Sequence, residues 1–285
     1  MLKRLLPLAL LAALSCPAAT PATHVVVIGL DGCTPFLLRE HSAGALRALW
    51  QEGAYTWTAE AAVPSVTQVN FAGMLTSSLP AKHGIDQVAW NFPVPPKVKA
   101  TTIFEVLAAR GLSGAAFLGH EKLYPVEKAA AGIHFEHSPH SVRETAPRAA
   151  RWLREKRPAF TFIYFGDLDG AGHRDGWGSD AQIATMAAIN AGVEQVMSAI
   201  RESPMRGRTV VIVTSDHGGL GKAHSQGRPE DRAIPWVCWG AGVKRGFALT
   251  EPVHNYDTAA TALYALGTAR PEVWDGRAVI EAFTP

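Results

Sequence analysis

Short apolar runs rich in Val and Ile alternate along this chain with segments of helical periodicity. Each run is apolar at nearly every position, which is typical of a strand buried on both faces of a sheet. The runs that we interpret as strands cover residues 24–30, 114–118, 159–165, 209–214 and 234–239. The helical patterns cover residues 101–110, 181–201 and 256–266. This alternation predicts an α/β fold with a mainly parallel central sheet and helices on both faces.

The composition is that of a globular protein, with 47% hydrophobic and 18% charged residues in a chain of 285. The formal net charge is only +2, so no basic excess indicates a nucleic-acid-binding platform. The sequence shows no internal repeat and no domain boundary, and we interpret the Pro-rich stretch 93–96 as a loop. We therefore predict one domain over residues 23–285.

The first 22 residues differ from the rest of the chain. A short basic start, Lys3-Arg4, precedes an apolar stretch, and small residues follow up to Ala22. This order is typical of a secretory signal peptide and is too short for a comfortable membrane span. We predict an exported protein, periplasmic or secreted, with lipid anchoring through Cys16 as the alternative. Because no later run reaches the roughly 18 apolar residues that a span needs, we expect no transmembrane helix.

Cleavage of this peptide would leave Cys33 and Cys238 as the cysteines of the mature chain. Two cysteines do not make a disulfide-dense scaffold. They could pair in an oxidising compartment, and two buried free thiols are an equal alternative.

Acidic residues follow three of the predicted strands. Asp31 comes after the first strand, Asp167 and Asp169 come after the strand that ends at residue 165, and Asp216 comes after the strand that ends at residue 214. Ligands of open α/β sheets bind beyond the carboxyl ends of the strands, so we expect these carboxylates to converge. His173 is four residues beyond Asp169 and would share its face on a helix, although the two intervening glycines favour a tight loop.

Imidazoles accompany these carboxylates, because His217 follows Asp216 directly and His224 lies seven residues further on. Three Asp and three His offer oxygen and nitrogen ligands, which suit zinc, with manganese or iron as substitutes. Six ligands exceed the needs of one tetrahedral zinc and predict two ions. His254 is the alternative to His224. We interpret the other histidines as surface or core residues: His24, His41, His83, His120, His134, His137 and His140.

A candidate nucleophile, Thr67, precedes a helical stretch. As a plain structural residue it would be an N-cap. As a functional residue its hydroxyl would attack, with proton loss favoured by a metal and by the helix N-terminus. Asn70, one turn later, would donate its amide to developing phosphoryl charge.

Together these pieces resemble the alkaline phosphatase superfamily, in particular its nucleotide pyrophosphatase/phosphodiesterase branch. The resemblance covers almost the whole of the chain after residue 22, in the order of the family. It is carried by four motifs: Val25-Val-Val-Ile-Gly-Leu-Asp31-Gly32; Thr67-x-x-Asn70 with Leu79-Pro80-x-x-His83-Gly84-Ile85; Asp169-x-x-Gly172-His173; and Ser215-Asp216-His217-Gly218.

The resemblance implies an alkaline phosphatase-like fold and a two-zinc site with a threonine nucleophile. Carried over, the first zinc would be held by Asp31, Thr67, Asp216 and His217. The second would be held by Asp169, His173 and His224. The implied activity is the hydrolysis of small phosphate esters, as a phosphodiesterase or nucleotide pyrophosphatase.

Two departures concern the substrate. Gln68-Val69 stands where the phosphodiesterases of the family usually carry Phe-Pro, and the chain lacks the insertions of larger members. Cys33-Thr34-Pro35-Phe36-Leu37 resembles the sulfatase nucleophile signal, but Leu37 replaces its Arg. Alternatives are a phosphomonoesterase, a phosphonate hydrolase or a catalytically silent envelope binding protein. We expect diesters to be preferred, because no Arg or Lys lies between Gln51 and Ala81 to bind the extra charge of a monoester.

Overall fold

The computed structural model describes residues 22–86, 96–119, 121–138 and 141–285. The predicted signal peptide up to residue 21, with Cys16, lies outside the described residues. So do residues 93–95 of the predicted loop, and His120 and His140.

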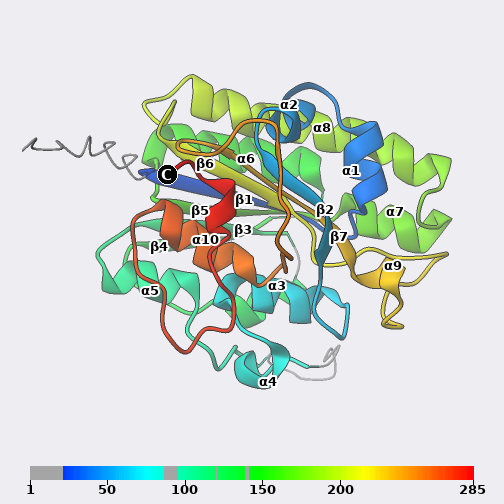
Figure 1. The fold of residues 1–285 in the computed structure, drawn as a ribbon, viewed down its shortest axis with the longest axis horizontal. Helices are drawn as coiled ribbons and strands as arrows, with labels where there is room; N and C mark the ends of the chain where they lie inside the picture. Colours follow the sequence, from blue (N-terminus) through cyan, green and yellow to red (C-terminus); the bar gives the residue numbers. More distant parts are fainter. Residues whose placement is uncertain (1–21, 87–95, 120, 139–140) are drawn as a thin grey trace, which may run out of the picture.

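One sheet of eight strands organises the described chain (Figure 1). The strands, in spatial order, are β4 (Ile133–His137), β3 (Gly114–Leu118), β5 (Phe160–Phe165), β1 (His24–Leu30), β6 (Thr209–Thr214), β7 (Ala233–Gly240), β2 (Ala54–Glu60) and β8 (Phe247–Ala248). β7 runs antiparallel to its neighbours β6 and β2, while β4, β3, β5, β1 and β6 are parallel. The prediction of a mainly parallel sheet is confirmed.

Helices cover both faces of this sheet, also as predicted (Figure 1). One face packs against α1 (Pro35–His41), α2 (Gly44–Gln51), α6 (Val142–Lys156), α7 (Asp167–Asp175) and α8 (Asp180–Arg201). The other packs against α3 (Thr67–Thr76), α5 (Ile103–Ala109), the 3-10 helix η1 (Glu121–Val126) and α10 (Asp257–Ala265). The short elements are α4 (Pro80–His83), α9 (Pro229–Arg232) and the 3-10 helix η2 (Ile280–Ala282). Along β1, alternate side chains enter the two cores, Val25 and Val27 on one face and Val26 and Ile28 on the other.

The five strands and three helices predicted from the sequence are present, with ends that differ by at most two residues. The prediction of a tight loop around Asp169 is wrong, because α7 is helical through both of its glycines. Cys33 and Cys238 are both free and buried, so the free-thiol alternative holds.

Among the described residues, α8 is long and apolar enough to cross a membrane by length and composition alone. One face of α8, which includes Ile189, Val193 and Val196, is fully buried in the core against the sheet. It also packs along α6. These contacts explain the apolar composition of α8 as that of a core helix.

Candidate active site

The sheet topology brings the three predicted carboxylates together. β1 lies between β5 and β6, and all three are parallel, so their carboxyl ends share one edge. Asp31 follows β1, Asp169 lies in the first turn of α7 after β5, and Asp216 follows β6. The Nε2 atom of His217 lies 3.2 Å from Asp31 Oδ1, 3.3 Å from Asp216 Oδ2 and 3.8 Å from Asp169 Oδ1. One imidazole thus faces all three carboxylates.

Asp31, Asp216 and His217 form a group that could hold one metal ion, and we call it the buried group. The hydroxyl of Tyr164 donates to Asp31 Oδ2 at 2.5 Å. The backbone N–H of Gly32 donates to Asp216 Oδ1 at 3.2 Å. These bonds leave one oxygen of each carboxylate directed toward His217.

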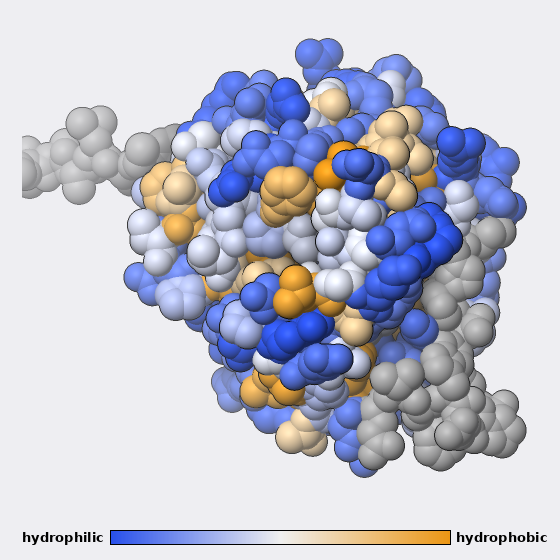
Figure 2. All heavy atoms as spheres, turned by 90° about the vertical axis from the view of Figure 1, so that its right-hand side faces the viewer, coloured by the Kyte–Doolittle hydropathy of each residue, from blue (hydrophilic) through white to orange (hydrophobic). Residues whose placement is uncertain are grey.

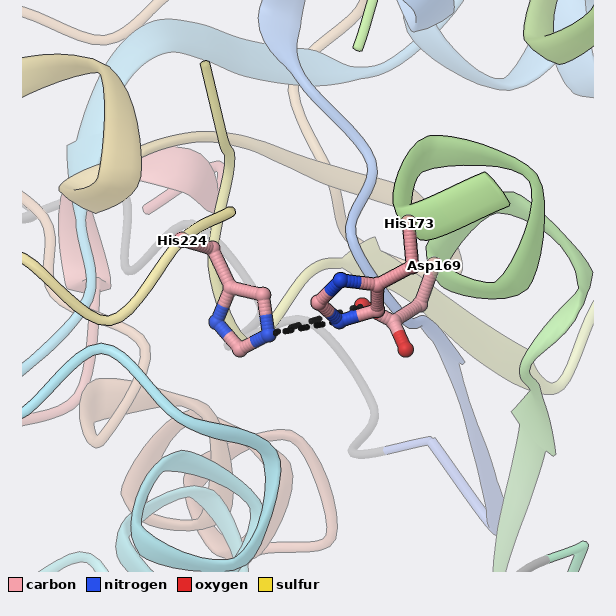
Figure 3. Close-up of side chains that lie close together, drawn as sticks. All are labelled: Asp169, His173 and His224. Carbon is pink, nitrogen blue, oxygen red and sulfur yellow. Dashed lines mark hydrogen bonds and ion pairs between the residues drawn. The ribbon is translucent and has the colours of Figure 1, made fainter. Parts of the chain in front are cut away.

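Asp169, His173 and His224 form a second such group, the open group (Figure 3). Asp169 and His173 are four residues apart on α7, and His173 Nε2 lies 3.4 Å from Asp169 Oδ1. His224 reaches the same carboxylate oxygen from the loop after β6, at 3.7 Å. The rings of His217 and His224 stack with centroids 3.6 Å apart, so the two groups adjoin.

Backbone carbonyls fix which nitrogen each histidine presents. The Nδ1 atom of each ring lies near one carbonyl oxygen. His217 Nδ1 is 2.9 Å from the Gly218 oxygen, His173 Nδ1 is 3.0 Å from the Lys222 oxygen, and His224 Nδ1 is 2.7 Å from the Ser65 oxygen. A neutral ring that donates from Nδ1 has its lone pair on Nε2, the form that binds a metal. The Nε2 atoms of His173 and His224 are only 3.1 Å apart (Figure 3). Two facing lone pairs repel, and a cation between them would remove that repulsion.

Several buried polar atoms here have no hydrogen-bond partner among the described residues. They include Asp31 Oδ1, Thr67 Oγ1, Asp169 Oδ1, Asp216 Oδ2 and His217 Nε2. A buried polar atom without a partner is costly, so such atoms call for an explanation. Their concentration at this edge of the sheet, on oxygen and nitrogen donors, fits divalent cations well.

The electrostatics of the metal-free protein agree with this fit. Burial raises the pKa of Asp216, and the nearby Asp31 carboxylate raises it further. Burial and Asp31 likewise raise the pKa of Asp169, to about 6. Burial alone would lower the pKa of His217, but the surrounding carboxylates raise it to about 10. In the metal-free protein the carboxylates therefore keep the imidazolium of His217 in its charged form beside them. A bound metal ion would supply the same positive charge.

Thr67 is the first residue of α3, and its side chain is buried. The alternative that it acts as an N-cap does not hold, because Val66 is the N-cap residue and no side chain caps this helix. α3 approaches β1 closely, since a Cβ on Gly29 would lie 2.5 Å from the Phe71 ring. Two residues before Thr67, the Ser65 hydroxyl donates to the His224 carbonyl at 2.7 Å. These contacts tie the start of α3 to the open group.

The predicted role of Asn70 conflicts with its surroundings. Its amide nitrogen donates to the carbonyls of Ala62, Pro64 and Val66, and its oxygen accepts from the Ala62 N–H and from Asn255. An amide engaged in this way has no donor left for a phosphoryl group. Asn70 instead holds the loop that leads into Thr67.

The remaining candidates lie elsewhere. His254 stacks on Tyr256 beside Asp257 and belongs to neither described group. His83 accepts from the Ile85 N–H within the core, in keeping with a structural role. Arg174, on α7, pairs with Asp175.

Sequence reasoning missed several supporting residues, notably Ser65, Tyr164 and Ser215. The Ser215 hydroxyl donates to the Leu30 carbonyl and accepts from the Cys33 N–H, so it joins the ends of β1 and β6. Ser215 stands within the motif Ser215-Asp216-His217-Gly218, and its position beside Asp216 was the available signal. Tyr164 carried no signal, because it reads as one more apolar strand residue.

Figure 2 views the face of the molecule at which the parallel strands end. Hydrophobic and hydrophilic side chains are interspersed over the described part of this face (Figure 2).

Comparisons with known proteins bear on the fold and on the family. A putative extracellular sulfatase Sulf-1 homolog from Caenorhabditis elegans is 30% identical over 106 residues, which is 35% of this chain and 15% of the relative. The structure of human ectonucleotide pyrophosphatase/phosphodiesterase 5 superposes with a TM-score of 0.75 at 13% identity, over 92% of this chain and all of the other. An inactive murine form of that protein, in complex with AMP, gives 0.72 at 13% identity, with 92% and 100% coverage.

These structural likenesses establish the fold, and the curated relative is matched over only a small part of its length. The sequence profile of the type I phosphodiesterase/nucleotide pyrophosphatase family matches residues 25–226. That range holds both ligand groups and Thr67, and it is most of the chain. The chain therefore belongs to the type I phosphodiesterase/nucleotide pyrophosphatase family.

Proposed function

We propose that the protein is an exported, two-zinc hydrolase of phosphoric esters that uses Thr67 as its nucleophile and prefers diesters or nucleotide pyrophosphates. One observation carries the proposal. Two adjacent groups of metal-ligand type, buried and open, lie at one sheet edge and carry buried polar atoms without a hydrogen-bond partner, and the Thr67 hydroxyl is another such buried atom.

The buried group, with Thr67, would hold one ion, and the open group would hold the other. Bound divalent cations would supply Lewis acidity and neutralise charge on the phosphoryl oxygens. Zinc suits these nitrogen and oxygen donors, and manganese or iron are substitutes.

The chain's own part in the reaction begins at Thr67. Its Oγ1 forms a bond to phosphorus while the bond from phosphorus to the leaving oxygen breaks, and the leaving group departs with a proton. Water then cleaves the phosphothreonine, which restores the hydroxyl and releases the phosphate product. The position of Thr67 at the N-terminus of α3 favours negative charge at this oxygen.

The family and the relatives support the substrate and the location. The family profile is that of phosphodiesterases and nucleotide pyrophosphatases, and the murine neighbour is seen with AMP. A curated relative is named as extracellular, and the first 22 residues have the order of a signal peptide. We therefore propose a small nucleotide-like ester as substrate and a periplasmic or secreted enzyme.

A specific observation favours a phosphomonoesterase as the second candidate. Burial acts to raise the pKa of both Asp31 and Asp169, and the Lys122 ammonium is among the groups that oppose it at both. At Asp31 the opposing groups, chiefly His217, prevail and lower the pKa to about 2, whereas the pKa of Asp169 stays raised. Lys122 is half-buried on η1, which packs against α3. A cation so placed could bind the extra charge of a monoester dianion.

The test of the main proposal is turnover of an aryl phosphodiester by the zinc-loaded protein. Thr67→Ala should abolish turnover and keep the bound zinc largely intact, whereas Thr67→Ser should retain part of the rate because a hydroxyl remains. Metal analysis should find about two zinc ions per chain. Wild-type turnover by Thr67→Ala would refute the covalent mechanism. A zinc-loaded wild type without turnover on any phosphate ester would leave the binding-protein alternative.

Lys122→Ala separates the two substrate classes. If monoesters are the substrates, this variant should lose much more kcat/KM on an aryl monoester than on the matched diester. Lys156→Ala, an exposed lysine beside Trp152, is the control. A wild-type monoester advantage of tenfold or more would reverse the diester assignment.

A further inference from the structure

Trp177 lies in the short connection between α7 and α8 and touches all three segments that carry the ligand-type residues. Its indole Nε1 donates to the Gly32 carbonyl at 3.0 Å, one residue beyond Asp31. Its backbone N–H donates to the Gly221 carbonyl at 2.7 Å, in the loop between His217 and His224. These two bonds join the end of β1 to the loop after β6.

Two glycines let those segments approach the indole. A Cβ on Gly172 of α7 would lie 2.7 Å from the ring, and one on Gly219 would lie 2.4 Å from it. Neither distance is open to a residue with a side chain unless something moves. Gly172 precedes His173, and Gly219 follows His217 by two residues. The indole therefore separates the two ligand-bearing segments at a spacing that only glycine permits.

The ring also faces the histidines themselves. Its centroid is 5.1 Å from that of His173, 5.6 Å from that of His224 and 6.4 Å from that of His217. These contacts span both groups, since His217 belongs to the buried group and the other two to the open group. Movement of the indole would change the relative position of all three rings.

Trp177 is not explained as an ordinary core residue. It is only half-buried, and it lines a cavity of about 240 Å³ together with Phe36, Gly219 and Glu230. Its neighbours on the inner side are the histidines and the glycines described above. The side chain of Trp177 therefore packs against the segments that carry the ligand-type residues.

We propose that Trp177 is a positioning residue that sets the spacing between the two ligand groups, by acting as a rigid wedge between α7, the end of β1 and the loop after β6. This inference rests on the proposed metal site. Residues that orient metal ligands, without binding the metal, typically change its affinity about 10–100-fold when they are removed.

The experiment measures zinc affinity of the full chain by competition with a chromophoric chelator. Trp177→Ala should weaken zinc binding about 10–100-fold. Trp177→Phe keeps a ring and loses the bond to Gly32, so its loss should be smaller. With cobalt in place of zinc, the visible absorption of Trp177→Ala should differ from that of the wild type. Thermal unfolding in excess chelator checks that the metal-free folds are equally stable.

A glycine pair tests the wedge without removing the indole. Gly172→Ala should weaken zinc binding, because the added methyl collides with the ring. Gly170→Ala is the matched control on the same helix, since a Cβ there has nothing within 4 Å, and it should bind zinc as the wild type does. In the Trp177→Ala background the new methyl has room, so Gly172→Ala should add no further loss.

The outcomes separate this inference from the proposed function. Wild-type zinc affinity in Trp177→Ala, with the wild type binding two ions, overturns the inference alone. A wild type that binds no zinc overturns the proposed function as well. If Trp177→Ala fails to fold, the glycine pair decides: equal affinity in Gly172→Ala and Gly170→Ala overturns the wedge, and a selective loss in Gly172→Ala supports it.

Discussion

The buried group and the open group carry similar donors, but the fold holds them differently. The side chains of Asp31, Asp216 and His217 are at most 1% exposed, whereas that of His173 is 46% exposed. The first group stands on the ends of two adjacent strands that Ser215 ties together. The second stands on α7 and on a loop that Ser65 and Trp177 hold in place.

This difference indicates a division of labour. The buried group is fixed by the sheet before any metal binds, and its carboxylates repel each other in the folded state. The open group reaches solvent through His173, while Asp169 and His224 are buried, and it depends on contacts between α7 and the loop after β6. We infer that the buried group has the tighter and more slowly exchanging ion, and that the open group faces the incoming substrate.

The largest effect should come from Asp216→Asn in the buried group. Loss of one charged ligand should cost several kcal/mol of transition-state stabilisation, or roughly 1,000-fold in kcat/KM. The metal-free variant should be at least as stable as the metal-free wild type, because the substitution removes a carboxyl group whose ionisation is opposed by burial and by Asp31. Kinetics and denaturant unfolding in chelator measure the two quantities. A strongly destabilised metal-free variant would show that repulsion does not govern this group, and Asp175→Asn, outside both groups, is the control.

His173→Ala breaks the open group with a smaller effect. We expect about one zinc to remain at stoichiometric metal and kcat/KM to fall roughly 100-fold, since one ion still polarises the ester. The metal-free stability should change by less than about 0.5 kcal/mol, as for other exposed side chains. Metal analysis after gel filtration counts the ions. Loss of both ions together would mean that the two groups form one cooperative site.

The sequence sufficed for the parallel core and for the convergence of the carboxylates. Strands such as residues 209–214 are buried on both faces, so composition alone identifies them. β1 lies between β5 and β6, so the carboxylates that follow these strands meet at one edge of the sheet. This agrees with the rule that ligands bind beyond the carboxyl ends of the strands.

What could not be predicted depends on tertiary contacts. β2 lies beyond β7, and its exposed positions, such as Thr58, obscure an apolar pattern. α7 is helical although it contains Gly170 and Gly172, which have low intrinsic helix propensity. Gly172 stands in this helix because the Trp177 ring leaves no room for a Cβ, and such a tertiary contact cannot be seen in the sequence. Asn70 has the residue type for a phosphoryl ligand, and only the structure shows that backbone carbonyls use its donors.

The pH dependence of the metal-free protein also distinguishes the buried group from the open group. The pKa of His217 is about 10 in the folded protein against an ordinary 6.5, so its contribution to stability is complete below pH 6.5 and is lost as the pH rises toward 10. Asp216, whose pKa is also raised, acts in the same direction. In the open group, His224 has a pKa lowered to about 4 by burial and His217, and its contribution is lost as the pH falls from 6.5. The raised pKa of Asp169 opposes this acid limb.

We therefore expect the free energy of unfolding in chelator to fall between pH 6.5 and 10, with a weaker change on the acid side. Zinc should reduce the alkaline fall, because the ion replaces the imidazolium as the partner of the carboxylates. Denaturant titrations at several pH values, with and without zinc, provide the measurement. A flat alkaline limb in chelator would show that His217 does not hold its proton.

The smallest effect should come from Tyr164→Phe, which alters the buried group from outside. The Tyr164 hydroxyl donates to Asp31 Oδ2, while its ring packs on Phe71 with centroids 5.4 Å apart. Phenylalanine keeps that packing and removes one donor, so the fold should persist. Asp31 would be oriented less firmly, and the affinity of the buried group for zinc should fall by about tenfold, at the low end for such partners. Because the Tyr164 hydroxyl donates its hydrogen bond to the buried group, only one of the two zinc equivalents should weaken in a chelator titration. Equal weakening of both would contradict the separation of the two groups, and no weakening would show that the strand ends alone orient Asp31.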